Sequence, residues 1–154
     1  MQPVDETYFE TAPFRKSQSW TIDKPAAEVW GEFAGDTPLH WCKGLSSITW
    51  TSPRPFAVGT TRQVKALFGL MTSDEQYFIW EEGHRQAFYF TGSNLPLFKA
   101  FAEDYIVEPL GENQCRLTWK VAATPTAVGR PGLPLNHFIF AGLFRDTGRY
   151  FNAA

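Results

Sequence analysis

Apolar and polar residues alternate along residues 17–22, and this two-residue period predicts a β-strand with one buried face. Pro25 follows, and residues 26–33 are predicted to form a helix, because proline suits a first helical position where no amide hydrogen is needed. Asp36-Thr37-Pro38 repeats this combination of a cap and a proline, and predicts a second short helix that carries Trp41. The chain is thus expected to open with a strand and two short helices.

Six further segments have strand character, and glycine turns such as Phe68-Gly69 and Glu82-Gly83 separate them. Residues 124–134 contain three prolines and two glycines, which predicts a linker rather than a continuation of the sheet. The predicted strands are residues 47–50, 60–66, 76–80, 86–91, 101–108 and 115–123.

The last predicted element is a helix that begins near Leu135. Placing its residues at 100° steps gathers an apolar stripe roughly 140° wide, with Arg145 and Arg149 on the opposite side. A stripe of this kind packs on an apolar surface. Its members are Ile139, Phe140, Leu143, Phe144, Tyr150 and Phe151.

The length of 154 residues suits one domain, with residues 1–16 as a loosely held N-terminal arm and residues 17–154 as the domain. A formal net charge of -2 argues against a nucleic-acid partner, which requires a basic surface. No segment has the length and apolarity of a signal peptide or membrane span. Cys42 and Cys115 lie far apart and form no Cys-x-x-Cys pattern, so we expect two free thiols, as is common in reducing compartments. We therefore expect a cytoplasmic protein. No cofactor is expected.

Four segments of the chain resemble the START/Bet v 1-like (SRPBCC) superfamily, and in particular its bacterial polyketide cyclase/dehydrase-like branch. The resemblance covers about residues 17–151 and is carried by Pro25-Ala26…Val29-Trp30, Val58-Gly59-Thr60-Thr61-Arg62, Glu82-Gly83-His84-Arg85, and Val107-Glu108-Pro109 with Cys115–Trp119.

The resemblance implies a helix-grip α+β fold, in agreement with the predicted order of elements. In this fold a curved antiparallel sheet of about seven strands surrounds a long C-terminal helix, two short helices follow the first strand, and the sheet and last helix enclose a cavity. The superfamily has no universal catalytic motif. Its members include lipid and hormone carriers, polyketide aromatase/cyclases, and stress-response or co-chaperone proteins, so the fold alone does not fix the function.

Strand parity decides which side chains face the predicted cavity. In the final strand, alternation places Leu117, Trp119 and Val121 on one side, which we expect to be the inner one. In the preceding strand, the resemblance favours Phe101, Glu103, Tyr105 and Val107 as inward. An unpaired buried carboxylate is costly, so Glu103 is expected to pair with a cation such as Arg62, to meet a ligand, or to lie at a wet cavity mouth.

Tyr77 and Tyr89 occupy matching alternate positions on neighbouring strands and could anchor a ligand's polar group, or could be core residues. Inward tyrosines would place four rings on the outer face: Phe78, Trp80, Phe88 and Phe90. An exposed cluster of rings would favour a homodimer. Coverage by the N-terminal arm and reversed parity are the competing explanations.

Histidine spacing provides no metal-ligand motif, so no metal site is expected. His137, at the edge of the apolar stripe, could bind a ligand or carry a proton, or could be a surface residue. Two connections, residues 67–71 and 94–98, are unusually apolar, and in the superfamily that the chain resembles such loops frame the cavity entrance. The alternative is that these residues extend the strand pairing or pack on the last helix.

The sequence therefore predicts binding of a hydrophobic or aromatic small molecule, lipid-like or polyketide-like, in an internal cavity. Two alternatives stay open: a polyketide cyclase/dehydrase-type enzyme and a chaperone-like protein-interaction module. The catalytic candidates are Glu103 and His137. The expected ligand-binding residues are Trp41, Arg62, Tyr77, Tyr89, Glu103, Tyr105, Trp119, Phe140 and Phe144.

Overall fold

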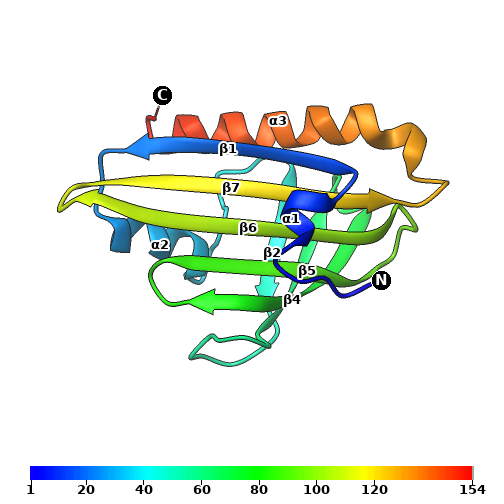
Figure 1. Ribbon diagram of the computed structural model, residues 1–154, viewed down its shortest axis with the longest axis horizontal. Coiled ribbons are helices and arrows are strands. Elements are labelled where there is room, and N and C mark those ends of the chain that lie inside the picture. Colours follow the sequence, from blue (N-terminus) through cyan, green and yellow to red (C-terminus); the bar gives the residue numbers. More distant parts are fainter. Residues whose placement is uncertain (154) are drawn as a thin grey trace.

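A computed structural model describes residues 1–153 and contains one seven-stranded antiparallel sheet with the strand order β1-β7-β6-β5-β4-β3-β2. The long C-terminal helix α3 runs along β1, at one edge of the sheet, and α2 lies at the end of the sheet where α3 ends (Figure 1). The predicted helix-grip α+β fold is confirmed. The elements are α1 (Tyr8–Thr11), β1 (Phe14–Ile22), α2 (Ala26–Ala34), β2 (Leu45–Trp50), β3 (Thr61–Ala66), β4 (Met71–Glu81), β5 (Arg85–Ser93), β6 (Phe98–Gly111), β7 (Gln114–Pro125), a 3₁₀ turn (Arg130–Gly132) and α3 (Leu133–Tyr150).

Several element boundaries differ from the sequence-based expectation. β1 begins at Phe14, inside the predicted arm, because Phe14 pairs with Ala123 of a β7 that is longer than predicted. Pro25 is the N-cap of α2 rather than its first residue. The predicted second helix at residues 36–41 is a series of turns instead, with Leu39 in the left-handed region at a φ of 56°, which helical geometry does not allow.

The inner face of the sheet packs against α2 and α3 and forms the main core. Leu117, Trp119 and Val121 are buried there, as their alternation along β7 predicts. Trp119 contacts Phe144 of α3 edge-on at a centroid distance of 5.1 Å. The apolar stripe of α3 thus lies on the sheet, with the exception of Tyr150, which is exposed at the end of the helix.

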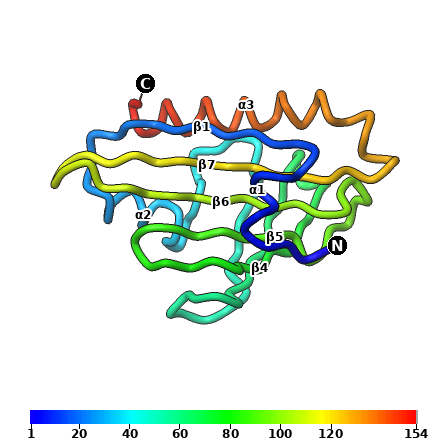
Figure 2. The backbone as a smooth tube through the Cα atoms, in the orientation of Figure 1, coloured from blue at the N-terminus to red at the C-terminus, as the bar shows by residue number. Residues whose placement is uncertain are grey.

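The N-terminal segment crosses the outer face of the sheet over β6 and β5 (Figure 2). Phe9 of α1 is buried and stacks on Phe78 with a centroid distance of 6.2 Å. Arg85 donates to both carboxylate oxygens of Asp104, at 3.0 and 2.8 Å, and to Glu6 at 2.7 Å, which connects the segment to the sheet. Phe9 and Ala12, within the predicted arm, are therefore packed on the outer face of the sheet.

The outer face carries fewer rings than predicted, because the expected parity is wrong along β5 and, on β4, after Phe78. A β-bulge between Tyr77 and Ile79 leaves Tyr77 and Trp80 both on the inner side of β4. On β5 it is Phe88 that is buried in the inner core, whereas Tyr89 packs on Phe78 in the outer cluster. Of the four rings predicted to be outside, Phe78 alone is outside, and the N-terminal segment covers it. The homodimer and the interaction module remain predictions that have lost this support.

Within residues 1–153, no helix combines the length and apolarity needed to cross a bilayer. Cys42 and Cys115 are both buried free thiols.

Candidate functional site

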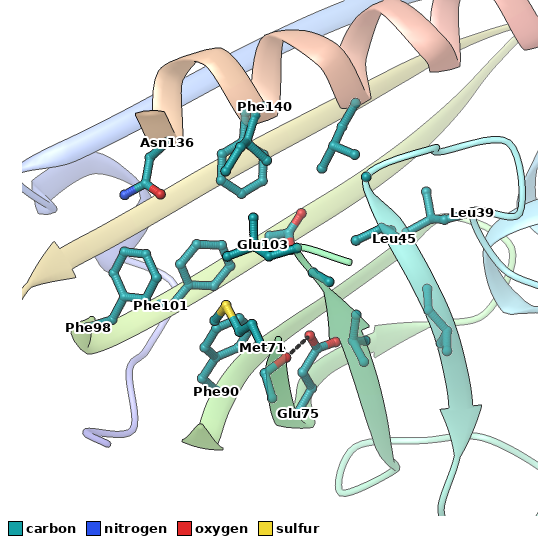
Figure 3. A pocket seen from close by; sticks show the side chains of 18 of the residues that line it. Leu39, Leu45, Met71, Glu75, Phe90, Phe98, Phe101, Glu103, Asn136 and Phe140 are labelled. Atoms are coloured by element: carbon teal, nitrogen blue, oxygen red, sulfur yellow. Dashed lines mark hydrogen bonds between the residues drawn. The ribbon is translucent and has the colours of Figure 1, made fainter. Parts of the chain in front are cut away.

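A cavity lies between α3 and the inner face of β2 to β7, where the curved sheet stands away from the helix. The cavity has a volume of about 90 Å³. Most of the lining is aliphatic or aromatic, with Phe98, Phe101 and Phe90 on one side and Leu39 and Leu45 on the other (Figure 3). Such a chamber suits a small apolar molecule or a slim chain.

Aromatic rings form a continuous wall at the α3 side of the cavity. Phe101 stacks on Phe90 at 4.2 Å and on Phe140 of α3 at 5.9 Å, and Phe98 contacts Phe101 at 5.1 Å. These rings come from β5, β6 and α3, so the wall exists only when the helix is docked on the sheet.

A buried ion pair lies at the sheet side of the cavity. Arg62 of β3 donates through Nε to Glu75 Oε1 of β4 at 2.7 Å, and Ser73 Oγ donates to Glu75 Oε2 at 3.3 Å. The two charged residues are cross-strand partners. Burial raises the pKa of Glu75, and the Arg62 charge opposes that rise.

Three rings surround the Arg62 guanidinium: Phe88, Tyr77 and Trp50, with distances of 4.6, 5.5 and 5.6 Å from Cζ to the ring centroids. The Nη1 atom is buried and has no hydrogen-bond partner among the described residues. The rings hold the guanidinium plane in place, so its position in the cavity wall is fixed by packing as well as by Glu75.

Glu103 of β6 is the second carboxyl group in the cavity, and it is 8% exposed. Its Oε1 accepts hydrogen bonds from Trp119 Nε1 and, at 3.5 Å, from the Tyr105 hydroxyl. No described residue donates to Oε2, and the side chain points into the chamber (Figure 3). Burial, followed by repulsion from Glu75, raises the pKa of Glu103 to about 8, so the carboxyl group is mainly protonated at neutral pH.

Five of the nine predicted ligand-binding residues line the cavity, namely Arg62, Glu103, Tyr105, Trp119 and Phe140. Of the three alternatives considered for Glu103, pairing with Arg62 does not occur, because Arg62 is the cross-strand partner of Glu75.

The other four predicted residues lie elsewhere. Tyr77 packs behind Arg62, and Phe144 packs between Trp119 and Trp20. Trp41 donates to Thr147 Oγ1 at 2.9 Å and stacks on Tyr150, near the end of α3. Tyr89 is on the outer face of the sheet.

Sequence reasoning missed Glu75, Ser73 and Asn136, all of which line the cavity. The first two fall in residues 71–75, which were left outside the predicted strand although β4 begins at Met71. Residues 72–76 are all polar, so no alternation of apolar and polar residues marks Ser73 and Glu75 as inward-facing.

The three histidines lie apart from the cavity lining. His137 is exposed on α3 with its ring against Phe14 at 4.6 Å. His40 is 3.3 Å from Glu32, and His84 contacts the Val107 carbonyl at 3.0 Å. His137 is therefore not placed to act on a molecule in this cavity. Among residues 1–153, no group of three or more His, Cys, Asp or Glu side chains could hold a metal ion.

The two apolar connections are at the cavity. Leu67 and Met71 of the β3–β4 connection line it, as do Leu97 and Phe98 around the start of β6. At the tip between β3 and β4, Phe68 is 99% exposed. Their positions agree with the predicted entrance beside α3.

Comparison with known proteins gives the family. A sequence model described as "Polyketide cyclase / dehydrase and lipid transport" matches residues 13–147. A protein of Mycobacterium tuberculosis is 38% identical over 158 aligned positions, which cover 97% of this chain and 92% of the relative.

Solved structures show the same fold at low identity. A START superfamily protein from Mycobacterium smegmatis has a TM-score of 0.72 at 9% identity, covering 90% of this chain and 97% of its own. The major latex-like protein 151 of Panax ginseng has a TM-score of 0.65 at 16% identity, with coverage of 90% and 97%. Since the family match extends over residues 13–147 and so includes β3, β4, β6 and most of α3, which carry the cavity, the chain belongs to the polyketide cyclase/dehydrase and lipid transport family.

Proposed function

We propose that this protein binds a hydrophobic or aromatic small molecule in the cavity between α3 and the sheet. The observation that carries the proposal is the combination of an aromatic and aliphatic lining with a small set of buried polar side chains, Arg62, Glu75 and Glu103. Apolar pockets with a few convergent polar groups are the usual form of small-molecule sites.

The dimensions of the cavity limit the ligand. Because the cavity volume is about 90 Å³, a single ring or a slim alkyl chain fits without rearrangement. A larger ligand requires the β3–β4 connection to move away from α3. Phe68, at the tip of that connection, makes no buried contact that would resist the movement.

The proposal is tested by blocking the chamber from α3. Ile139 lines the cavity, whereas its neighbour Phe138 is 76% exposed and does not. Ile139→Trp should reduce the affinity for toluene, a neutral apolar single-ring probe, by about tenfold or more, while the matched control Phe138→Trp should bind as the parent does. Native mass spectrometry of gently purified protein should also detect a co-purified apolar molecule. Equal toluene binding by both variants would place the probe elsewhere and remove the support for this cavity.

A second candidate function is an enzyme of the cyclase/dehydrase type, and Glu103 is the observation that favours it. A buried carboxyl group with a pKa of about 8 can donate and recover a proton near neutral pH. Glu103→Gln keeps the size and most hydrogen bonds of the side chain but removes proton exchange. With a polyketone substrate, an enzyme should lose turnover by about 10²-fold or more while still binding. Equal turnover in variant and parent would remove Glu103 from any acid–base role.

A further inference from the structure

The hydrogen-bond polarity of the buried groups indicates what kind of ligand fits them. Glu75 accepts from Arg62 and Ser73, so each of its oxygens has a protein donor. Arg62 has only N–H donors, and Nη1 lacks a partner. Glu103 Oε2 also has no donor among the described residues, and its character as donor or acceptor depends on where the proton of Glu103 resides. The other buried side-chain groups without a partner among residues 1–153, the Tyr77 hydroxyl and the Gln86 amide, are not part of the cavity lining.

The contacts of Glu103 place that proton on Oε2. The Trp119 indole N–H can only donate, and it donates to Oε1, as does the Tyr105 hydroxyl. These two donors lower the pKa of Glu103, but burial and the Glu75 charge outweigh them. In the neutral carboxyl group that results, Oε1 is the acceptor oxygen and the O–H is on Oε2, the oxygen that no described residue donates to. No basic side chain among the described residues is within salt-bridge distance of Glu103, because Arg62 is paired with Glu75 instead.

The charged and titratable groups around Glu103 support the neutral form. Burial raises the pKa of Glu103 most, and the Glu75 charge on β4 raises it further by repelling a second carboxylate. The Arg62 charge on β3 lowers this pKa by a smaller amount, because Arg62 is paired with Glu75. Tyr77, Tyr105 and Cys42 are buried, and burial raises the pKa of each. From α3 the cavity receives only Asn136, Ile139, Phe140 and Leu143, none of which titrates.

Building on the binding function above, we propose that this cavity selects apolar molecules whose buried end carries a neutral hydrogen-bond acceptor, a ketone or aldehyde carbonyl, and that Glu103 Oε2–H is the donor that holds it. A hydrocarbon of the same shape leaves this O–H unpaired in an apolar chamber. A carboxylate introduces a charge beside Glu75, where the nearest cation is already paired. An ammonium group requires Glu103 to ionise first.

Four single-ring probes of similar size separate these classes: acetophenone, ethylbenzene, benzoate and benzylamine. Titration is followed at pH 6.5 and pH 9 through the NMR signal of the Trp119 indole N–H, which is assigned by its loss in Trp119→Phe. At pH 6.5 acetophenone should bind about tenfold more tightly than ethylbenzene, the ratio expected for one buried hydrogen bond. At pH 9 this preference should disappear and benzylamine should gain affinity, because ionised Glu103 only accepts.

Three variants test the donor. Glu103→Gln carries an N–H donor at every pH, so acetophenone should keep its advantage at both pH 6.5 and pH 9. Glu103→Leu has no donor, and the two uncharged probes should bind equally. Should the leucine variant fail to fold, the glutamine variant still decides, since a preference that varies with pH in it contradicts the proposal. The exposed Glu112 provides a control for the loss of one acidic group, and Glu112→Gln should behave as the parent.

Other outcomes overturn the inference in distinguishable ways. If ethylbenzene binds as tightly as acetophenone at pH 6.5, or if benzoate or benzylamine binds most tightly there, the cavity binds ligands but does not select a neutral acceptor. If none of the four probes binds, the proposed function and this inference both fail.

Discussion

The protonation state of Glu103 makes the stability of the fold depend on pH in a specific way, and Glu103→Gln isolates that dependence. Between the ordinary pKa of 4.5 and the raised pKa of about 8, the folded protein holds a proton that the unfolded chain has released. Raising the pH through this interval therefore favours unfolding. Below pH 4.5 both states are protonated, and above pH 8 both are ionised, so the free energy of unfolding is insensitive to Glu103 outside the interval.

The magnitude follows from the width of the interval. A change of 3.5 units, from 4.5 to 8, at about 1.4 kcal/mol per unit gives an upper limit of about 5 kcal/mol for the loss of stability through Glu103. The side chain is 8% exposed, so screening by solvent reduces this value little. In Glu103→Gln the amide is neutral at every pH, and the loss disappears. The variant should match the parent within about 1 kcal/mol at pH 5 and exceed its stability by about 3–5 kcal/mol at pH 9.

Equilibrium unfolding in urea, followed by tryptophan fluorescence at pH 5, 6, 7, 8 and 9, measures this difference. Glu75 and Asp104 also have raised pKa values, so the slope of a single curve does not assign the effect, whereas the difference between parent and variant does. Glu112→Gln should give a curve parallel to that of the parent. Parallel curves for Glu103→Gln and the parent from pH 5 to pH 9 would refute a neutral Glu103, because they would mean that its pKa is the same in the folded and unfolded states.

Three further predictions concern packing and pairing. Arg85→Ala leaves the fully buried Asp104 without its cation and should lower the free energy of unfolding, measured in urea, by about 3–5 kcal/mol. A decrease of less than about 1 kcal/mol would show that Asp104 is protonated. Trp119→Ala should lower the free energy of unfolding by about 3–5 kcal/mol and also weaken acetophenone binding. Unchanged affinity would show that the Trp119 ring serves only as a core residue. Phe9→Ala should lower the free energy of unfolding by about 3 kcal/mol and increase the binding of a hydrophobic dye, because Phe78 becomes exposed. Unchanged dye binding would show that other residues cover Phe78.

The order of elements could be read from the sequence because it depends on local signals. Alternation, glycine turns and the apolar stripe of α3 are properties of neighbouring residues, and they predicted the sheet and the helix that packs on it. The inward set on β6 and β7 was also predictable. Those two strands pair without interruption from Ala100 to Pro109, so parity established at Trp119 carries over to Glu103.

The prediction of which side chains face inward failed on β4 and β5, where the sequence does not distinguish an inner from an outer face. Residues 86–90 of β5 are largely apolar on both faces, because the N-terminal segment buries the outer face as the core buries the inner one. On β4 the bulge after Tyr77 changes the parity of the residues that follow, and a bulge is a property of the pairing with β5.

The polar end of the cavity was decided by tertiary structure alone. Arg62 meets Glu75 because β3 and β4 pair in a register that places them opposite each other, and this leaves Glu103 to Trp119 and Tyr105. The sequence determined that one of two adjacent acids on β6, Glu103 or Asp104, would point inward, because successive side chains of a strand face opposite sides. Whether Glu103 is charged depends on whether Arg62 pairs with Glu103 or with Glu75. Distances between side chains on different strands are set only when the sheet and α3 pack together.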